Sequence, residues 1–182
     1  MAETKILSIS NIATIGVITA FTCILAPFSI PIGTIPISLT NLVIYFGLYI
    51  LGAKREFISY CVYLLIGLVG LPVFSGFTAG PQKLFGPTGG YLIGFIPMAI
   101  VAGIFIEKFE RKLIPSMIGM MLGTIICYAI GTAWLAYQAH MDFVAALAVG
   151  VFPFIIHYLI KIIFAAVVAP QIYKRLVIAN VL

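Results

Sequence analysis

The sequence predicts an all-helical membrane protein, a bundle of six transmembrane helices with both termini in the cytoplasm. Of its 182 residues, 63% are hydrophobic and only 8% are charged, whereas soluble domains carry about 25% charged residues. Apolar runs long enough to cross a hydrocarbon layer alternate with short polar segments. The basic residues gather in the segments that six spans would place on one side. We therefore expect one membrane-embedded domain over residues 1–182, with the lipid bilayer as its surroundings.

The spans follow from the apolar runs in chain order. We expect them at residues 11–28, 38–53, 57–71, 91–106, 115–138 and 143–173. An uncharged Pro/Gly turn, Ser29 to Pro36, joins the first two, and the longest connection, Pro72 to Gly90, joins the third and fourth. A polar turn with His140 and Asp142 separates the last two.

The charges orient this bundle. With the N-terminus inside, eight basic residues fall on one face and only Lys83 on the other, while Lys161 lies within a span. The eight are Lys5, Lys54, Arg55, Lys108, Arg111, Lys112, Lys174 and Arg175. An odd number of spans would scatter them, so the positive-inside rule predicts cytoplasmic termini and an outward-facing 72–90 connection.

Several function classes find no support in the sequence. It contains no Gly-x-x-x-x-Gly-Lys-Ser/Thr phosphate loop, no paired His/Cys metal spacing and no Gly-x-Ser-x-Gly elbow. The net charge of +5 lies in small clusters between spans, which encodes topology better than it serves nucleic-acid binding. Cys23, Cys61 and Cys127 stand alone in apolar runs and are interpreted as packing residues. We expect no enzyme, no metal and no cofactor bound by this chain.

We expect no carboxylate within the membrane, because Asp142 and all four glutamates fall at span ends. This weakens the hypothesis of a proton-coupled carrier, which usually needs such a group at membrane depth.

Lys161 is the most informative single residue. A charge near the middle of a span costs about 2.5–3.5 kcal/mol on insertion scales, and no acidic residue lies at matching depth. Lys161 could extend toward the cytoplasmic face, or it could face the interior and bind an anionic ligand such as a carboxylate. His157 lies one turn earlier and is expected on the same face, and Pro153 is expected to bend the helix.

Other candidate site residues cluster in the long connection and at the second span. Gly86-Pro87-Thr88-Gly89-Gly90-Tyr91 leads into the fourth span, where glycines allow close backbone approach; an ordinary tight turn is the alternative. Thr40 and Asn41 could cap the second span or line an outward-opening pocket.

Small residues recur four apart at three places. Gly90 and Gly94, and likewise Gly119 and Gly123, are expected to pack helices within the bundle. The pair in the first span, Gly16 and Ala20, could instead dock a partner helix.

The long connection carries a family resemblance. Leu71-Pro72-Val73-Phe74-x-Gly, followed by Gly86-Pro87-Thr88-Gly89-Gly90-Tyr91-Leu92-Ile93-Gly94-Phe95, resembles the BioY family, the biotin-binding S-components of energy-coupling-factor (ECF) vitamin transporters. Pro153-Phe154-Ile155 and Lys161 resemble the family's Pro-Phe-x-x-Gly/x-Asp-x-x-Lys pattern. The resemblance covers essentially the whole chain.

The resemblance implies a small subunit of the bacterial cell membrane that captures biotin outside the cell. The subunit would dock on the scaffold subunit EcfT through its first span, and two partner ATPase subunits would use ATP. The pocket would lie on the extracellular side, with ligand-binding residues drawn from both segments: Lys161, His157, Tyr91, Gly86, Pro87, Thr88, Gly89, Gly90, Phe74, Thr40 and Asn41.

Two departures from the family pattern leave alternatives open. His157 is taken to stand where the family has an aspartate, and Phe77-Thr78-Ala79 stands where glycines are common. Both changes suit a less polar ring, so lipoate is the alternative ligand. A stand-alone facilitator is the second alternative.

Overall fold

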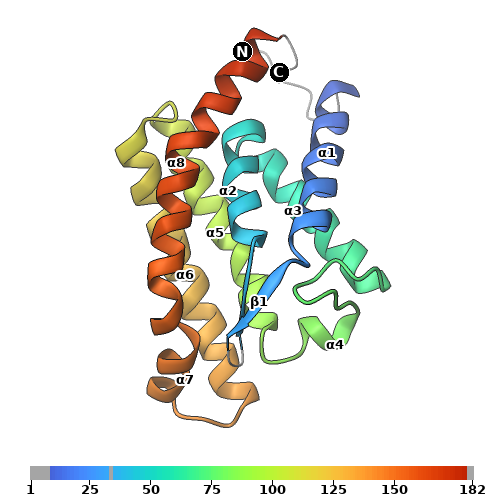
Figure 1. The fold of residues 1–182 in the computed structure, drawn as a ribbon, viewed down its shortest axis with the longest axis vertical. Helices are drawn as coiled ribbons and strands as arrows, with labels where there is room; N and C mark the ends of the chain where they lie inside the picture. Colours follow the sequence, from blue (N-terminus) through green and yellow to red (C-terminus); the bar gives the residue numbers. More distant parts are fainter. Residues whose placement is uncertain (1–8, 33–34, 180–182) are drawn as a thin grey trace.

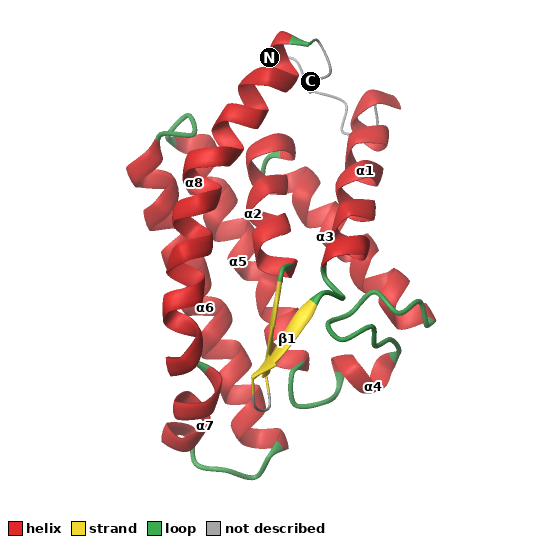
Figure 2. Cartoon of the chain, viewed as in Figure 1, coloured by secondary structure: helices red, strands yellow, loops and turns green. Residues whose placement is uncertain are grey.

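The computed structural model describes residues 9–32 and 35–179, and the chain is mostly helical (Figures 1 and 2). Its long helices lie side by side along the long axis of the molecule. In chain order the elements are α1 (Ile9–Leu25), β1 (Ser29–Ile32), β2 (Ile35–Ser38), α2 (Thr40–Leu51), α3 (Ala53–Val69), α4 (Pro81–Leu84), α5 (Gly89–Lys108), α6 (Leu113–Gln138), α7 (Phe143–Gly150), the 3-10 helix η1 (Phe152–Phe154) and α8 (Ile155–Ile178).

Each expected span coincides with helix, but the sixth is broken. Residues 143–150 form α7, residues 155–178 form α8, and Pro153 lies in the 3-10 turn between them, because proline cannot donate the hydrogen bond that a continuous helix requires. Three helical stretches are long and apolar enough to cross a membrane: 89–108, 113–138 and 143–178. Helices α1 and α2 are apolar but shorter. A helical membrane protein is therefore supported, while six full crossings stay a prediction.

The basic segments gather at one end of the bundle. The α2–α3 junction, the α5–α6 connection and the C-terminal end of α8 all lie there, whereas α4 and α7 lie at the opposite end (Figure 1). Seven of the eight basic residues counted above fall in these three segments, and Lys83 falls on α4. The eighth, Lys5, lies outside the described residues, as does Glu3.

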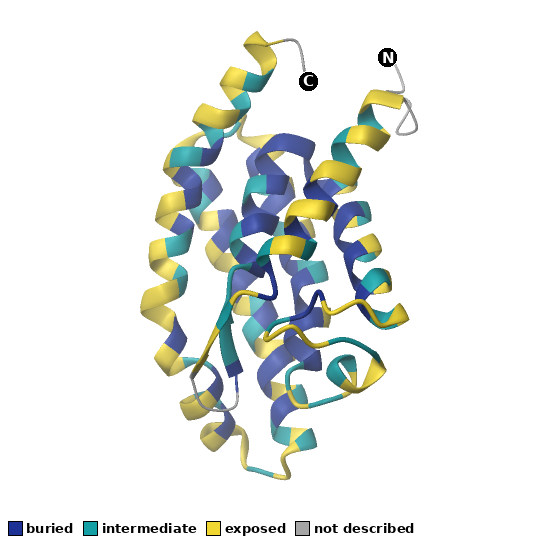
Figure 3. Ribbon diagram, turned by 45° about the vertical axis from the view of Figure 1, so that its right-hand side comes forward, coloured by how far each residue is buried: buried dark blue, intermediate teal, exposed yellow. Residues whose placement is uncertain are grey.

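The outer faces of the helices are apolar. Figure 3 shows exposed residues along the outside of α1 and α8 and buried ones between the helices. On α8, Ile156 is 69% exposed and Ile160 is 60% exposed. A bundle that presents such side chains outward is suited to lipid rather than water.

The central packing joins α5 to α6 through glycines. An added Cβ at Gly94 would lie 3.0 Å from the carbonyl oxygen of Cys127, and one at Gly123 would lie 2.7 Å from that of Met98. At Gly90 and Gly119 an added Cβ would meet Trp134 and Phe105. The prediction that these glycine pairs pack helices within the bundle is confirmed.

The segment expected as a Pro/Gly turn contains a two-stranded hairpin. Strands β1 and β2 pair antiparallel, with Ser29 opposite Ser38 and Pro31 opposite Pro36. A proline lacks the amide proton for a hydrogen bond between strands, so a segment with two prolines does not have the usual sequence pattern of paired strands.

Glu56 lies at a helix end, as expected, in the first turn of α3. It is nevertheless fully buried, and neither carboxyl oxygen has a hydrogen-bond partner among the described residues. Its carboxyl group packs against Gly47, where a Cβ would clash with it. A buried polar group without partners opposes folding.

We expect Glu56→Met to stabilise the fold, because methionine fills similar space without an unpaired carboxyl group. Removing the unsatisfied group is worth about 1–3 kcal/mol, or several degrees in unfolding temperature at roughly 2–4 °C per kcal/mol. Glu107→Met is the opposing control, since Glu107 accepts a hydrogen bond from the amide of Ala53 at 2.8 Å, and its loss should lower the unfolding temperature. Thermal unfolding in detergent checks both, and a fall for Glu56→Met would contradict the first expectation.

Candidate functional site

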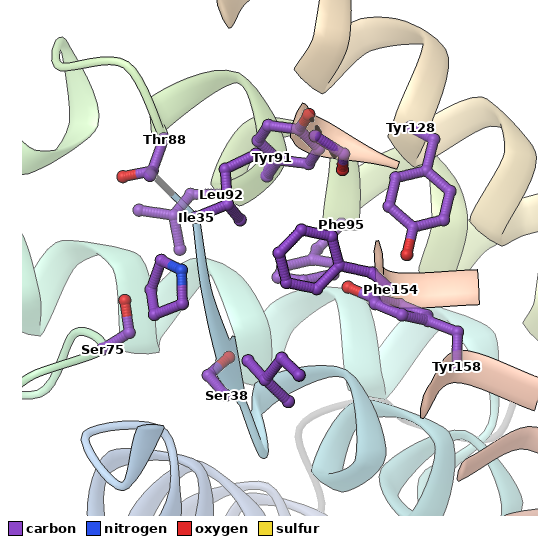
Figure 4. Close-up of a pocket in the computed structure, with 13 residues that line it drawn as sticks. Ile35, Ser38, Ser75, Thr88, Tyr91, Leu92, Phe95, Tyr128, Phe154 and Tyr158 are labelled. Carbon is purple, nitrogen blue, oxygen red and sulfur yellow. Dashed lines mark hydrogen bonds between the residues drawn. The ribbon is translucent and has the colours of Figure 1, made fainter. Parts of the chain in front are cut away.

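A small cavity lies at the end of the bundle away from the basic segments, between the hairpin and the ends of α5, α6 and α8 (Figure 4). Its free volume is about 40 Å³. The lining residues are Ile35, Pro36, Ile37, Ser38, Ser75, Thr88, Tyr91, Leu92, Phe95, Tyr128, Gly150, Phe154 and Tyr158. None of these carries a formal charge, so the lining offers hydroxyl groups, aromatic rings and aliphatic surface.

The 72–90 connection is fastened to the bundle on both sides of the cavity. Phe74 is fully buried, and its ring meets that of Tyr63 edge to face at 5.6 Å. The amide of Gly76 donates to the carbonyl of Pro27 at 2.9 Å. Further along, the indole Nε1 of Trp134 on α6 donates to the carbonyl of Gly86 at 2.9 Å. The connection is therefore an ordered cover, held from α3 and from α6.

Lys161 lies at the inner edge of this cavity. Its Nζ donates to the carbonyl oxygen of Ser38 at 2.6 Å and to Oδ1 of Asn41 at 3.0 Å. Asn41 is buried, and its Nδ2 has no partner among the described residues. An ammonium group has three N–H donors and an amide has two, so this corner presents donors beyond those already used. Since Ser38 lines the cavity, the donors lie directly beside it.

The opposite wall is aromatic. Tyr128 on α6 and Tyr158 on α8 have ring centroids 5.0 Å apart, and Tyr91 meets Tyr128 edge to face at 6.3 Å. The hydroxyl of Tyr91 is engaged with Thr132 and with the carbonyl of Gly150. Lys161 Nζ lies 5.3 Å from the ring centroid of Tyr158, which connects the donor corner to the aromatic wall.

The sequence-predicted residues divide into three groups. Thr88 and Tyr91 line the cavity. Lys161, Asn41 and Thr40 lie next to it through Ser38, whose hydroxyl is 3.0 Å from that of Thr40. The remaining six do not line it: His157, Phe74, Gly86, Pro87, Gly89 and Gly90.

His157 is a clear correction. It is exposed on the outer face of α8, whereas the Lys161 ammonium group reaches inward to Ser38 and Asn41. Tyr158 occupies the inward position instead. Counted back from Lys161, the aspartate of the Pro-Phe-x-x-Gly/x-Asp-x-x-Lys pattern also falls at 158.

Phe74 and the glycines pack the 72–90 connection against the helices and do not line the cavity. Phe74 fills the space left by Gly67 in the core. A Cβ on Gly89 would collide with the Leu84 carbonyl, and one on Gly90 would collide with Trp134. These residues bring the 72–90 connection close to α5 and α6, which is how they shape the cavity.

Sequence reasoning missed most of the lining. The hairpin residues Ile35 and Pro36 came from a segment expected to be a simple turn, and Ser38 was expected to begin the second span. Phe95 could have been found from spacing, since Tyr91 and Phe95 lie one turn apart on α5. The pairing of Tyr128 with Tyr158 depends on how α6 and α8 cross and had no signal in the sequence.

The first helix presents the small pair that was expected to dock a partner. Gly16 and Ala20 are both exposed on α1, and none of the described residues lies within 4 Å of an added Cβ at Gly16. Beside them runs an apolar groove of about 670 Å³ between α1, α2 and α8, with Val17, Phe21 and Phe46 among its lining residues.

Comparison with known proteins gives one consistent answer. The BioY family model matches residues 1–177. The chain is 35% identical to biotin transporter BioY2 of Lactococcus lactis subsp. cremoris, over 97% of this chain and 95% of that protein. It is 40% identical to biotin transporter BioY of Thermotoga maritima, over 87% of this chain and 93% of that one. Among solved structures it matches the 2.1 Å crystal structure of the S-component for biotin from an ECF-type ABC transporter, with a TM-score of 0.86, 30% identity and 95% coverage of both chains.

Proposed function

This chain belongs to the BioY family, and on that premise we propose that it is a biotin-binding S-component of an ECF-type importer. It is a membrane transport protein and not an enzyme. The relatives reported above are two biotin transporters and an S-component for biotin, and none of them is named for lipoate. Lipoate therefore remains only as a comparison ligand.

The observation that carries this proposal is the donor corner beside the cavity. Lys161 and the unpartnered Nδ2 of Asn41 lie at its edge, and no carboxylate among the described residues pairs with the lysine. A partly buried cation without a counter-ion at membrane depth is costly unless a ligand supplies the negative charge. The carboxylate of biotin is such a ligand, and the aromatic wall next to it suits the ring system.

The cavity as it stands is too small for biotin. Pockets that hold small molecules measure about 300–1,000 Å³, whereas this one holds about 40 Å³. Biotin binding therefore requires the hairpin to move away from α5 and α8, or the 72–90 connection to lift. The connection is held by the buried ring of Phe74 and by Trp134, and the hairpin is held by Lys161, which donates to the carbonyl oxygen of Ser38.

The orientation follows from the charges. The cavity lies at the end opposite the basic segments. This supports an orientation in which the cavity faces the outside of the bacterial cell and both termini lie in the cytoplasm, as the positive-inside rule predicts. Uptake would be driven by two ATPase subunits acting through the scaffold subunit EcfT. The exposed Gly16 and Ala20, with the apolar groove beside them, would form the docking surface.

Isothermal titration calorimetry on the purified chain tests the ligand. We expect biotin to bind with a dissociation constant in the micromolar range or tighter, and lipoate to bind more weakly. Absence of biotin binding would overturn the proposal. Biotin uptake into vesicles that contain this chain alone, without ATP, would favour the facilitator hypothesis instead.

Docking is tested by Gly16→Trp. Because Gly16 faces open space, we expect the change to leave biotin affinity and unfolding temperature unaltered while it blocks close approach of a partner helix. Co-purification with the scaffold and ATPases, and ATP-driven uptake, should fall at least tenfold. Ile156→Trp, on the exposed face of α8, is the matched control and should leave both unchanged. Normal co-purification of Gly16→Trp would remove this face from the docking surface.

A further inference from the structure

The hydroxyl group of Tyr128 is an unexplained feature of the aromatic wall. It is buried and has no hydrogen-bond partner among the described residues, although its ring packs against Tyr91 and Tyr158. A buried hydroxyl without a partner is disfavoured. The neighbouring Tyr91 hydroxyl, by contrast, is hydrogen-bonded to Thr132 and to the carbonyl of Gly150.

Tyr158 brings a second hydroxyl to the same place. It reaches the cavity from α8 while Tyr128 reaches it from α6, as Figure 4 shows. The two ring centroids are 5.0 Å apart at an angle of 57°, which brings both phenol groups to one part of the lining. Phe95 and Phe154 complete that part. No charged side chain lines it among the residues that the structure describes.

We propose that Tyr128 and Tyr158 form a subsite of two neutral hydroxyl groups that bind the ring of the ligand and determine which ligand the protein prefers. This inference rests on the proposed function. A cyclic urea offers one carbonyl acceptor and two N–H donors, and each phenol can donate one hydrogen bond and accept another. The Tyr128 hydroxyl donates to the carbonyl oxygen, and the Tyr158 hydroxyl accepts from an N–H. Lys161 and Asn41 are left for the carboxylate.

A neutral subsite and one with a carboxylate at position 158 should differ in their preference between a neutral and a cationic ligand ring. Two phenols do not stabilise a positive charge as an aspartate does. The wild-type chain should therefore prefer biotin to 2-iminobiotin, in which a cationic guanidinium replaces the neutral urea. Placing a carboxylate at 158 should reverse that preference.

The experiment is calorimetry on the full chain with biotin, desthiobiotin, 2-iminobiotin and lipoate. We expect Tyr128→Phe and Tyr158→Phe each to weaken biotin and desthiobiotin about 3- to 10-fold, the range for a single neutral hydrogen bond. Lipoate, which lacks the urea, should change less than twofold. Tyr158→Asp should shift the affinity ratio of 2-iminobiotin to biotin by at least tenfold toward 2-iminobiotin. Tyr137→Phe, on the exposed part of α6, is the matched control and should change nothing.

The outcomes distinguish a failure of biotin binding from a failure of the tyrosine subsite alone. If the wild-type chain does not bind biotin, the proposed function falls and this subsite with it. If the wild-type chain binds biotin and both phenylalanine variants bind it within twofold of wild type, the subsite alone is overturned. Equal losses for biotin and lipoate would also overturn it, because they would show a general packing effect. Unfolding temperatures of the variants show whether each retains its fold.

Discussion

Lys161→Met is expected to weaken biotin binding by roughly 10- to 150-fold. Hydrogen bonds to a charged group contribute about 1.5–3 kcal/mol, and each 1.4 kcal/mol is about tenfold in affinity. The ammonium group lies at the cavity edge with two protein partners, Ser38 and Asn41. Methionine keeps the length of the side chain but offers no donor, so the carboxylate of the ligand would lose its counter-charge. Titration calorimetry with biotin measures the effect.

Two comparisons make this result specific to the carboxylate. Biotin amide, which lacks the negative charge, should bind wild type and Lys161→Met with nearly equal affinity. Lys83→Met is the matched control, since Lys83 lies on α4 outside the cavity lining, and partial burial lowers its pKa. An unchanged biotin affinity for Lys161→Met would remove Lys161 from the ligand contacts.

Gly123→Val is expected to disrupt the fold more than any other single change discussed. An added Cβ at this position lies 2.7 Å from the carbonyl oxygen of Met98 and 3.1 Å from its Cγ, and valine adds two methyl groups beyond it. Overpacking of this kind costs about 1–3 kcal/mol or more. At roughly 2–4 °C per kcal/mol, the unfolding temperature should fall by about 5 °C or more, with loss of folded protein on size-exclusion chromatography.

Gly16→Val provides the control for that change. It makes the same substitution at a position where no atom of the described part of the chain lies within 4 Å of the new Cβ. The unfolding temperature should therefore stay within about 1 °C, or rise slightly because glycine is a poor helix former. If both variants are equally stable, the tight α5–α6 crossing does not limit stability.

The helices were predictable because lipid imposes a simple pattern on the sequence. Apolar runs between charged segments located all six helical stretches to within a few residues, and Pro153 marked the break between α7 and α8. This pattern does not indicate how each helix is rotated about its own axis, that is, which of its faces points into the bundle. A lipid-facing side chain and a core-facing one are equally apolar, so His157 and Tyr158 could not be told apart until α8 was packed.

The site was only partly predictable for the same reason. Lys161 and Asn41 stood out because polar groups are rare in such a sequence, and the structure places them together. The hairpin went unrecognised because Pro31 and Pro36 interrupt the usual strand signal. The aromatic wall joins residues 91, 128 and 158, and contacts across such distances in the chain depend on how the helices cross.

The hydrogen bond between Trp134 and the carbonyl of Gly86 has a practical consequence. Trp134 is the only tryptophan of the chain, so when excitation avoids the tyrosines, the intrinsic fluorescence comes from this one indole. Any displacement of the 85–88 segment would change the polarity around the indole N–H, and with it the emission wavelength. The protein thus contains a native optical reporter in contact with the 72–90 connection, and stopped-flow mixing could follow the movement of this connection in real time without an attached dye.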